Sequence, residues 1–317
     1  MNDPAIEADT LRKAYGTITA LDGLSFQVPA GSVLGLLGPN GSGKTTAVSI
    51  LSTTLRPDAG RAIVCGLDAV ADAPAVRQLI GLAGQFAAVD ANLTGRENLM
   101  LIARLSRVGR RHASGRAAEL LDQFGLMPAA DRLVRTYSGG MRRRLDVAAA
   151  LLHHPRVLFL DEPTTGLDPE SRIVLWDSIA GLVRDGTTLL LTTQYLEEAD
   201  ALADNIVIIA AGRMVDTGTP SQLKSRLGAV MFTLGFAGEP EAVRACRVLA
   251  AAGQPAERTG SHVSMRSAAG SGAIAQVLRV LDGQVPDPVT VTVREPTLDD
   301  VFLALTGSGI TAGGMAA

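Results

Sequence analysis

The residues of this chain best suited to chemistry begin with a glycine-rich segment that ends in a lysine and two threonines. The segment reads Gly38-Pro39-Asn40-Gly41-Ser42-Gly43-Lys44-Thr45-Thr46. Its glycines allow backbone N–H groups to converge on phosphate oxygens, and the start of a following helix adds partial positive charge. This is the Walker A pattern, in which Lys44 reaches the β- and γ-phosphates of a nucleotide and Thr45 ligates Mg²⁺. We therefore expect the segment to bind ATP.

Two adjacent carboxylates, Asp161 and Glu162, directly follow the apolar run 157–160. After a Walker A loop, such a pair at the end of a strand fits a Walker B motif. We expect Asp161 to hold Mg²⁺, through a water, and Glu162 to polarise the attacking water as a general base. A solvated strand edge is the alternative interpretation, and the apolar run before the pair argues against it.

A Ser-Gly-Gly turn lies between these two motifs, at Ser138-Gly139-Gly140. The Ser138 hydroxyl and the Gly140 N–H can both donate to phosphate at the start of a helix. Standing alone, the triplet would indicate only an ordinary glycine-rich turn. Its place between Walker A and Walker B indicates a second element that contacts phosphate.

In this order of motifs the chain resembles the ATP-binding cassette (ABC) ATPases, whose signature loop reads Leu-Ser-Gly-Gly-Gln. The resemblance implies that the Ser138 turn caps the γ-phosphate held by a second copy of the chain. Two nucleotides would then lie between two copies arranged head to tail. Tyr137 and Met141 replace the family's leucine and glutamine, but both flank the atoms that contact phosphate.

The same resemblance implies roles for three more residues. Tyr15 stands where the family stacks an aromatic ring on adenine, although an isolated tyrosine can also be a half-buried packing residue. Gln85 matches the glutamine that touches Mg²⁺ or its water, and the segment after it would face a transmembrane partner. Asp168 belongs to Gly166-Leu167-Asp168, which resembles the loop that bridges the two sites of the dimer.

One position departs from the family pattern. The segment Leu191-Thr192-Thr193-Gln194 ends in glutamine, where the family usually has a histidine that contacts the γ-phosphate. An amide can donate a hydrogen bond but cannot titrate. Either Gln194 is a neutral γ-phosphate sensor with a role in catalysis, or the site is hydrolytically impaired and acts by binding. We favour the first interpretation because the lysine and both carboxylates are present.

Longer segments narrow the resemblance to the daunorubicin-resistance (DrrA-type) ATP-binding subunits, whose switch position also carries glutamine. The segments run over 136–146, 191–200 and 296–307. This resemblance implies an ATPase that drives efflux of a drug, antibiotic or lipid through a separate membrane subunit. A soluble ABC ATPase acting on ribosomes or DNA and a nucleotide-gated regulatory subunit with little turnover are the alternatives.

The composition favours a soluble bacterial subunit without a nucleic-acid partner. The net charge is −3, whereas nucleic-acid binders usually carry a basic excess. The arginine run 142–144 is accordingly more typical of a solvated face, or of positive charge near the nucleotide. No apolar run approaches the ~18 residues of a membrane span. We expect a peripheral protein at the cytoplasmic face of the membrane, in a GC-rich bacterium because only 3 of 29 basic residues are lysines.

The elements that must position these motifs alternate between strands and helices. Strands are predicted at 24–28, 33–37, 63–65, 80–84, 157–160 and 188–191, with a hairpin over 206–216. Together with the resemblance, this order predicts an α/β fold: a P-loop ABC cassette with a RecA-like core over 1–227 and a helical subdomain over about 86–150. A small α/β domain is expected over 228–306 and a flexible tail over 307–317. The small domain either supports dimerisation or docking, or only packs.

The glutamine at the switch position leads to a prediction about pH. The four histidines of the chain are His112, His153, His154 and His262. Because none stands at the switch, the pH–rate profile of ATP hydrolysis should lack a limb near pH ~6.5 from a switch imidazole. A steep rise there that survives replacement of all four histidines would contradict this expectation.

Overall fold

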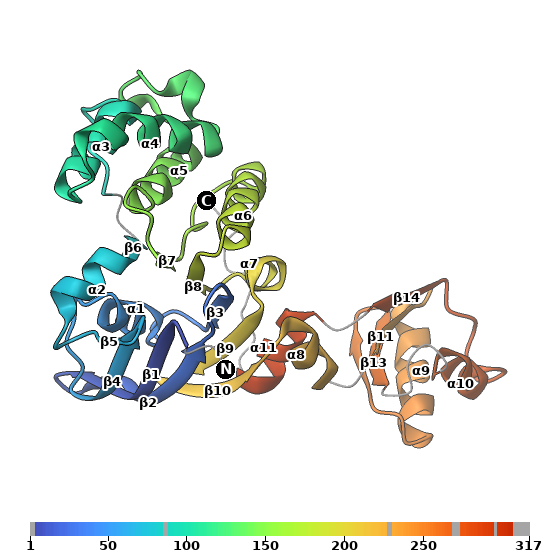
Figure 1. Cartoon of the computed structure of the whole chain (residues 1–317). Coiled ribbons are helices and arrows are strands. Elements are labelled where there is room, and N and C mark those ends of the chain that lie inside the picture. Colours follow the sequence, from blue (N-terminus) through green and yellow to red (C-terminus); the bar gives the residue numbers. More distant parts are fainter. Residues whose placement is uncertain (1–3, 85–87, 227–229, 268–272, 295–296, 307–317) are drawn as a thin grey trace. The chain divides into compact units, whose positions relative to one another are not determined.

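The computed structural model describes residues 4–84, 88–226, 230–267, 273–294 and 297–306 (Figure 1). The chain divides into two compact units, Met1–Pro220 and Ser221–Ala317. Each unit is considered by itself. No helix within the described ranges combines the length and the hydropathy that crossing a bilayer requires.

The first unit is built on a mainly parallel sheet of six strands. These strands are β3 (Val33–Leu37), β6 (Ile80–Ala83), β7 (Val157–Asp161), β8 (Thr188–Thr193), β9 (Asn205–Ala210) and β10 (Arg213–Gly218). They lie in the order β10-β9-β3-β8-β7-β6. All neighbours are parallel except β10, which forms an antiparallel hairpin with β9. The predicted α/β class is confirmed.

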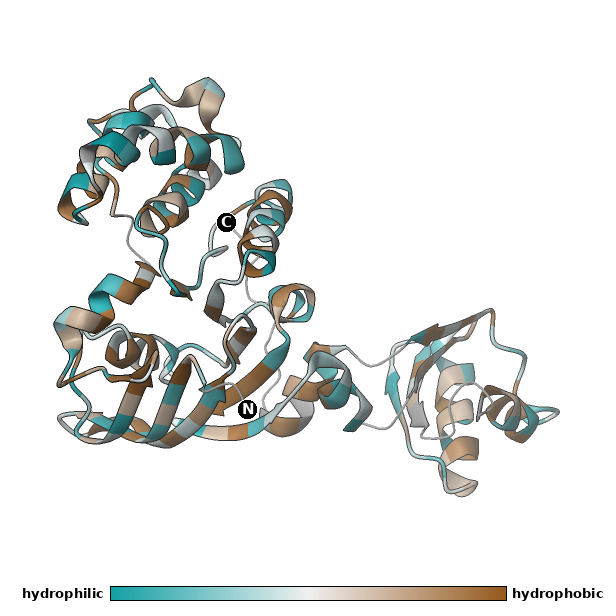
Figure 2. Cartoon of the chain, viewed as in Figure 1, coloured by the Kyte–Doolittle hydropathy of each residue, from teal (hydrophilic) through white to brown (hydrophobic). Residues whose placement is uncertain are grey.

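A second, antiparallel sheet covers one side of this core in the order β2-β1-β4-β5. Its strands are β1 (Ile6–Tyr15), β2 (Ile18–Val28), β4 (Ala59–Val64) and β5 (Leu67–Asp68). In Figure 2, hydrophobic and hydrophilic bands follow one another along the strands of this sheet. Over 24–28 of β2 the residues alternate between buried and more exposed positions, because one face of the strand is buried and the other is not. The buried face packs on α1 (Lys44–Leu51).

The strands at the centre of the parallel sheet are buried on both faces. Val157 and Phe159 of β7 pack in the cluster that includes α1 and the antiparallel sheet. Leu158 and Leu160 pack in a second cluster, with residues of helices on the other face. Side chains of a strand point alternately to opposite faces, so an unbroken apolar run is what a strand between two cores requires.

The helices of the second cluster include those predicted to form the helical subdomain. The helices of this unit after α1 are α2 (Ala73–Leu79), α3 (Gly95–Leu105), α4 (Arg110–Gln123), α5 (Gly139–Ala150), α6 (Pro169–Arg184) and α7 (Leu196–Leu202). A capping box starts α3, where Thr94 Oγ1 accepts from Glu97 N and Glu97 Oε2 accepts from Thr94 N. In Figure 1, α3, α4 and α5 lie together.

Besides the two-residue strand β5, two strands escaped the sequence analysis. The first is β1, whose pairing with β2 is interrupted between Ala8 and Leu11 and again further along. Such irregularities break the two-residue alternation by which a strand is recognised. The second is β12 (Ala256–Thr259), a short edge strand that is mostly exposed. Neither carries the apolar signal that predicted β3, β7 and β8.

The second unit has its own small sheet and core. After α8 (Pro220–Arg226), it contains β11 (Val230–Gly235), α9 (Glu239–Ala251), β12, β13 (His262–Ser267), α10 (Ala273–Leu281), β14 (Thr290–Arg294) and α11 (Leu298–Thr306). The antiparallel sheet has the order β12-β13-β11-β14. This is the split β-α-β arrangement of ferredoxin-like domains. Residues of α9 and α10 join Phe232 and Leu234 in one apolar cluster. The tail expected over 307–317 lies outside the described residues.

The junction of β14 and α11 is held by a buried carboxylate. Asp300 is 7% exposed. It receives two hydrogen bonds from the Arg294 guanidinium, at 2.8 and 3.1 Å, and further ones from the N–H and hydroxyl of Thr297. Burial raises the pKa of Asp300, but the bonds from Arg294 and Thr297 outweigh it, so the pKa is lowered overall.

We predict that Asp300→Asn loosens α11. Loss of the charged acceptor should cost about 1–3 kcal/mol in local stability, so amide hydrogen exchange over 298–306 should accelerate at neutral pH. Since the folded pKa is lowered, the stabilisation exists above the ordinary carboxyl pKa and fades as the pH falls through the folded value. The difference from wild type should therefore shrink in acid. The exposed neighbour Asp299 gives the matched control, Asp299→Asn, and equal exchange in both variants would refute the prediction.

Candidate nucleotide site

The register of three neighbouring parallel strands brings the sequence motifs together. Leu37, the last residue of β3, lies opposite Thr193 of β8. Thr192 of β8 lies opposite Asp161 of β7. Because the carboxyl ends of parallel strands share one edge of the sheet, the Walker A loop, Gln194 and Glu162 leave that edge side by side.

The backbone of the Walker A loop depends on its glycines. Gly43, directly before α1, has φ +108°, and a Cβ there would lie 2.4 Å from the carbonyl oxygen of Ala20. A Cβ on Gly38 would lie 2.4 Å from the carbonyl oxygen of Ile209. Only glycine fits such contacts, and the positive φ at Gly43 favours it further. The loop therefore needs glycine at both positions to lead directly into α1.

Lys44 is almost completely buried in this loop, with 4% of the residue exposed. Its ammonium donates to the carbonyl oxygens of Gly38 at 2.9 Å and Pro39 at 3.2 Å. It also lies 3.4 Å from Oε1 of Glu162. The cation and the predicted general base therefore meet at the edge where the strands end.

The oxygen atoms predicted to hold a metal also converge. The Thr45 hydroxyl donates to Oδ1 of Asp161 at 3.3 Å. The Thr192 hydroxyl donates to the same oxygen. Hydroxyl and carboxylate oxygens are the ligand types that Mg²⁺ prefers, and Mg²⁺ usually completes its shell with water and substrate phosphate. Among the described residues, no group of three or more His, Cys, Asp or Glu could hold a metal ion.

Glu162 adopts an unusual backbone conformation, with φ +47°. Its N–H donates to the carbonyl oxygen of Thr192 at 3.1 Å and to the Thr192 hydroxyl at 3.0 Å. Its Oε2 accepts from the Thr165 hydroxyl at 3.3 Å. Left-handed conformations of non-glycine residues are uncommon and concentrate at functional sites. The carboxylate is thereby held beside Lys44.

The Ser-Gly-Gly turn lies at the start of α5, as predicted, and the helix begins at Gly139. Ser138 caps it, with Oγ accepting from Met141 N at 3.2 Å. Ser138 and Gly139 are exposed, whereas Gly140 is buried. A Cβ on Gly140 would lie 2.5 Å from Oγ of Ser171 on α6. The exposed N-terminus of α5 can therefore accept an anion from outside the chain.

The remaining predicted site residues have different surroundings. Tyr15 is half-exposed at the end of β1. Asp168 caps α6, because its carboxylate accepts from the N–H and the hydroxyl of Ser171, each at 2.8 Å, and these bonds lower its pKa. Gln194 is partly exposed between β8 and α7. Gln85 lies outside the described residues.

Arg143 is the site residue that the sequence analysis missed. Its guanidinium donates to three backbone carbonyls, those of Gly84 at 2.5 Å, Pro163 at 2.9 Å and Asp161 at 3.0 Å. It also donates to Oδ2 of Asp146 at 3.1 Å. Arg143 thereby joins α5, the helix that starts at the Ser-Gly-Gly turn, to the ends of β6 and β7 and the residues that follow them. The side chain is only 12% exposed, so the description of the arginine run as a solvated face is wrong at this position.

Asp146 completes this connection. Its Oδ1 accepts from Ala88 N at 2.7 Å, so Arg143 and Asp146 together hold Gly84 and Ala88, on either side of residues 85–87. Burial raises the pKa of Asp146, against the opposing effects of Ala88 N–H and Arg143. A single arginine in the sequence gives no signal of such a role, because the carbonyls come from distant segments.

The fold and the converging loop, lysine and carboxylates define a P-loop nucleotide-binding protein. Residues 21–165 match the family model described as ABC transporter. The chain is 51% identical to the daunorubicin resistance ATP-binding protein DrrA2 of Streptomyces coeruleorubidus, over 97% of this chain and 96% of that protein. It is 47% identical to the daunorubicin/doxorubicin resistance ATP-binding protein DrrA of Streptomyces peucetius, over 96% and 92% of the two chains.

A solved structure, described as an ATP-binding subunit of an ABC transporter, is 25% identical with a TM-score of 0.64, over 71% of this chain and 93% of that one. The chain therefore belongs to the ABC transporter family as an ATP-binding protein. It is an ATPase, and the predicted resemblance to the DrrA-type subunits is confirmed.

The geometry around Arg143 leads to a prediction. Lysine keeps the charge but lacks the planar fork that reaches several acceptors at once. Arg143→Lys should leave buried acceptors unpaired and lower the free energy of unfolding by about 2–3 kcal/mol. It should also reduce kcat for ATP hydrolysis. Thermal denaturation and steady-state ATPase assays measure the two effects.

Arg142→Lys is the matched control, because Arg142 is exposed and makes one 3.3 Å bond to the carbonyl of Tyr137. Its stability should change by less than about 0.5 kcal/mol. Equal stability and activity of the two variants would remove Arg143 from this role.

Proposed function

We propose that this chain is the ATP-hydrolysing subunit of an exporter that moves a drug, antibiotic or lipid through a separate membrane subunit. The observation that carries the proposal is the extent of the similarity to resistance ATP-binding proteins. The similarity covers 97% of the chain at 51% identity. It therefore includes the second unit as well as the first. The subunit would act at the cytoplasmic face of the membrane.

The arrangement of the site supports a head-to-tail dimer with two bound nucleotides. Ser138 and Gly139 are exposed at the N-terminus of α5, where a helix attracts anions. In the proposed dimer they contact the γ-phosphate held by Lys44 of the second copy. Asp168 bridges the two sites, and Tyr15 stacks on adenine. A single chain would then hold only half of each catalytic site.

The proposed chemistry assigns each residue at the strand edge one task. Mg²⁺, held by Thr45, Asp161 and Gln85, would neutralise phosphate charge. Lys44 and the N–H groups of the loop stabilise the charge that develops on the γ-phosphate. Glu162 orients and deprotonates the attacking water. Gln194 donates a hydrogen bond from its side-chain amide to the γ-phosphate.

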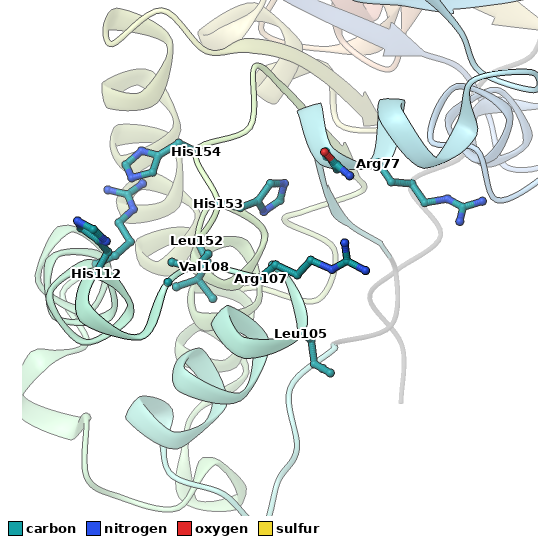
Figure 3. Close-up of a pocket in the computed structure, with 12 residues that line it drawn as sticks. Arg77, Leu105, Arg107, Val108, His112, Leu152, His153 and His154 are labelled. Carbon is teal, nitrogen blue, oxygen red and sulfur yellow. The ribbon is translucent and has the colours of Figure 1, made fainter.

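A groove in the first unit supports a docking site for the membrane subunit. Its volume is about 820 Å³, and its lining includes Arg77 of α2, Leu105 of α3 and His153. Figure 3 shows Arg77 and Arg107 at one end, His112 and His154 at the other, and His153 between them. The lining contains three arginines and three histidines but no carboxylate. We propose that an acidic segment of the membrane subunit binds here.

An exposed apolar side chain of the lining, Leu105, extends the proposed surface. Leu105 is 74% exposed, and Leu101 and Leu82 are exposed to lesser extents. Leu82 belongs to β6, which ends just before Gly84 and the predicted Gln85. Movement at the nucleotide site could thereby reach the groove through β6 and the helices that Arg143 ties to it.

The role of Glu162 and the dimer are tested together. Glu162→Gln removes the base but keeps the shape, so it should bind ATP and hydrolyse it about 10²–10⁴-fold more slowly. Gel filtration of this variant with ATP and Mg²⁺ should show a dimer. Adding Ser138→Arg should keep it monomeric, because the larger cation occupies the γ-phosphate position. The control is Ser114→Arg in the same background, since Ser114 is an exposed serine of α4. Near-normal hydrolysis by the Glu162→Gln variant would exclude the proposed base.

The groove is tested with Arg107→Glu. Reversing this charge should weaken co-purification with the co-expressed membrane subunit about ten-fold or more, because a like charge now faces the acidic segment. Basal ATPase activity should stay unchanged, since the groove is separate from the strand edge. Arg111→Glu, at an exposed arginine outside the groove lining, is the control. A soluble ATPase acting on ribosomes or DNA would co-purify with no membrane protein, and a regulatory subunit would show little ATPase activity even with one.

A further inference from the structure

Glu198 of α7 is a buried carboxyl that none of the nucleotide-binding motifs explains. The residue is 0% exposed. Its Oε1 accepts a hydrogen bond from the indole N–H of Trp176 on α6, at 3.1 Å. Its Oε2 has no hydrogen-bond partner within the described ranges. Buried ionisable groups are costly and call for a specific reason.

The groups around this carboxyl come from segments that adjoin the catalytic residues. The pKa of Glu198 is raised by burial, whereas Thr193, Thr164, Trp176 and the charge of Arg143 lower it. Thr193 directly precedes Gln194, and Thr164 follows Glu162 by two residues. Both threonines are 1% exposed. Glu198 therefore lies close both to the residue before Gln194 and to the segment that follows Glu162.

A second contact joins the same two helices. The guanidinium of Arg172 on α6 lies 4.9 Å from the ring centroid of Tyr195, the residue next to Gln194. The Arg172 Nε also donates to the carbonyl of Leu167 at 3.4 Å. Arg172 and Trp176 are four residues apart, so they share one face of α6. This face contacts the chain at the start of α7 in two places.

We propose that Glu198 is a positioning residue that couples Gln194 to the segment between Glu162 and Asp168 through its contact with Trp176. The inference rests on the proposed γ-phosphate contact of Gln194. Because α6 begins directly after Asp168 and α7 almost directly after Gln194, fixing the two helices to each other fixes these two residues. The amide of Gln194 then moves toward the γ-phosphate only together with the segment that bridges the dimer.

The kinetic test compares Glu198→Ala with Glu197→Ala, because Glu197 is the exposed neighbour on the same helix. Glu198→Ala should lower kcat about ten-fold or more, since a small misplacement of a catalytic group is costly. The KM for ATP should change less than about two-fold, because the Walker A loop is untouched. Glu198→Gln keeps an acceptor for the Trp176 indole and should restore most of kcat.

Trp176→Phe provides an independent variant if Glu198→Ala does not fold. It removes the indole donor while keeping an aromatic ring at this position. It should lower kcat in the same direction with little change in KM. A double variant, Trp176→Phe with Glu198→Ala, should be no slower than Glu198→Ala alone, because both changes remove one interaction. Unchanged kcat in the folded single variants overturns the proposal.

Trp176 is also the only tryptophan of the chain, so its fluorescence reports the contact directly. In the Glu162→Gln background, ATP should shift the emission of Trp176. With Glu198→Ala added, ATP should still bind but the shift should be lost. An equal shift in both proteins, with the dimer formed, overturns the coupling while leaving the proposed function intact. Failure of the Glu162→Gln protein to bind ATP or dimerise would instead count against the proposed function.

Discussion

The register of the parallel strands β3, β8 and β7 is the constraint on which the rest of the site depends. Leu37 is level with Thr193, and Thr192 is level with Asp161. A shift of one residue in either pairing would turn every side chain of a strand to the other core. Since β7 has apolar residues on both sides, Phe159 toward one cluster and Leu160 toward the other, both cores must be satisfied at once. The position of Glu162 relative to Lys44 follows from this requirement.

Buried charged side chains connect the carboxyl ends of these strands to the helices around them. Arg143 reaches from α5 to the carbonyls that follow β6 and β7, and Asp146 balances its charge. Such a charge is tolerable in the interior because its donors are paired with acceptors. Because of these contacts of Arg143, α5 cannot shift without affecting the ends of β6 and β7. The Ser-Gly-Gly turn is the N-terminus of this helix. In the proposed function, an ATP-driven change at the site passes through α5 to the helices around it.

Several features of the site could be predicted from the sequence because they depend on local chemistry. The glycines of the Walker A loop, the apolar run before Asp161 and the turn at Ser138 each have a spacing with a physical reason, and each lies where the strand-loop-helix order required. The resemblance also predicts that Gln194 stands at the switch position. The role of each of these residues in catalysis remains a proposal. The strand β1 was missed because its irregular pairing breaks the alternation, and β12 because it is short and exposed.

The sequence by itself determined the class of site, since phosphate binding needs particular residues within a few positions of one another. It also determined that position 194 carries a neutral amide. Only the tertiary structure decided how these motifs are supported. Arg143 meets Gly84 and Pro163, and Trp176 meets Glu198, across separations in the chain that carry no periodic signal. Such contacts arise when the sheet and the helices pack together, so a buried arginine and an exposed one look alike in the sequence.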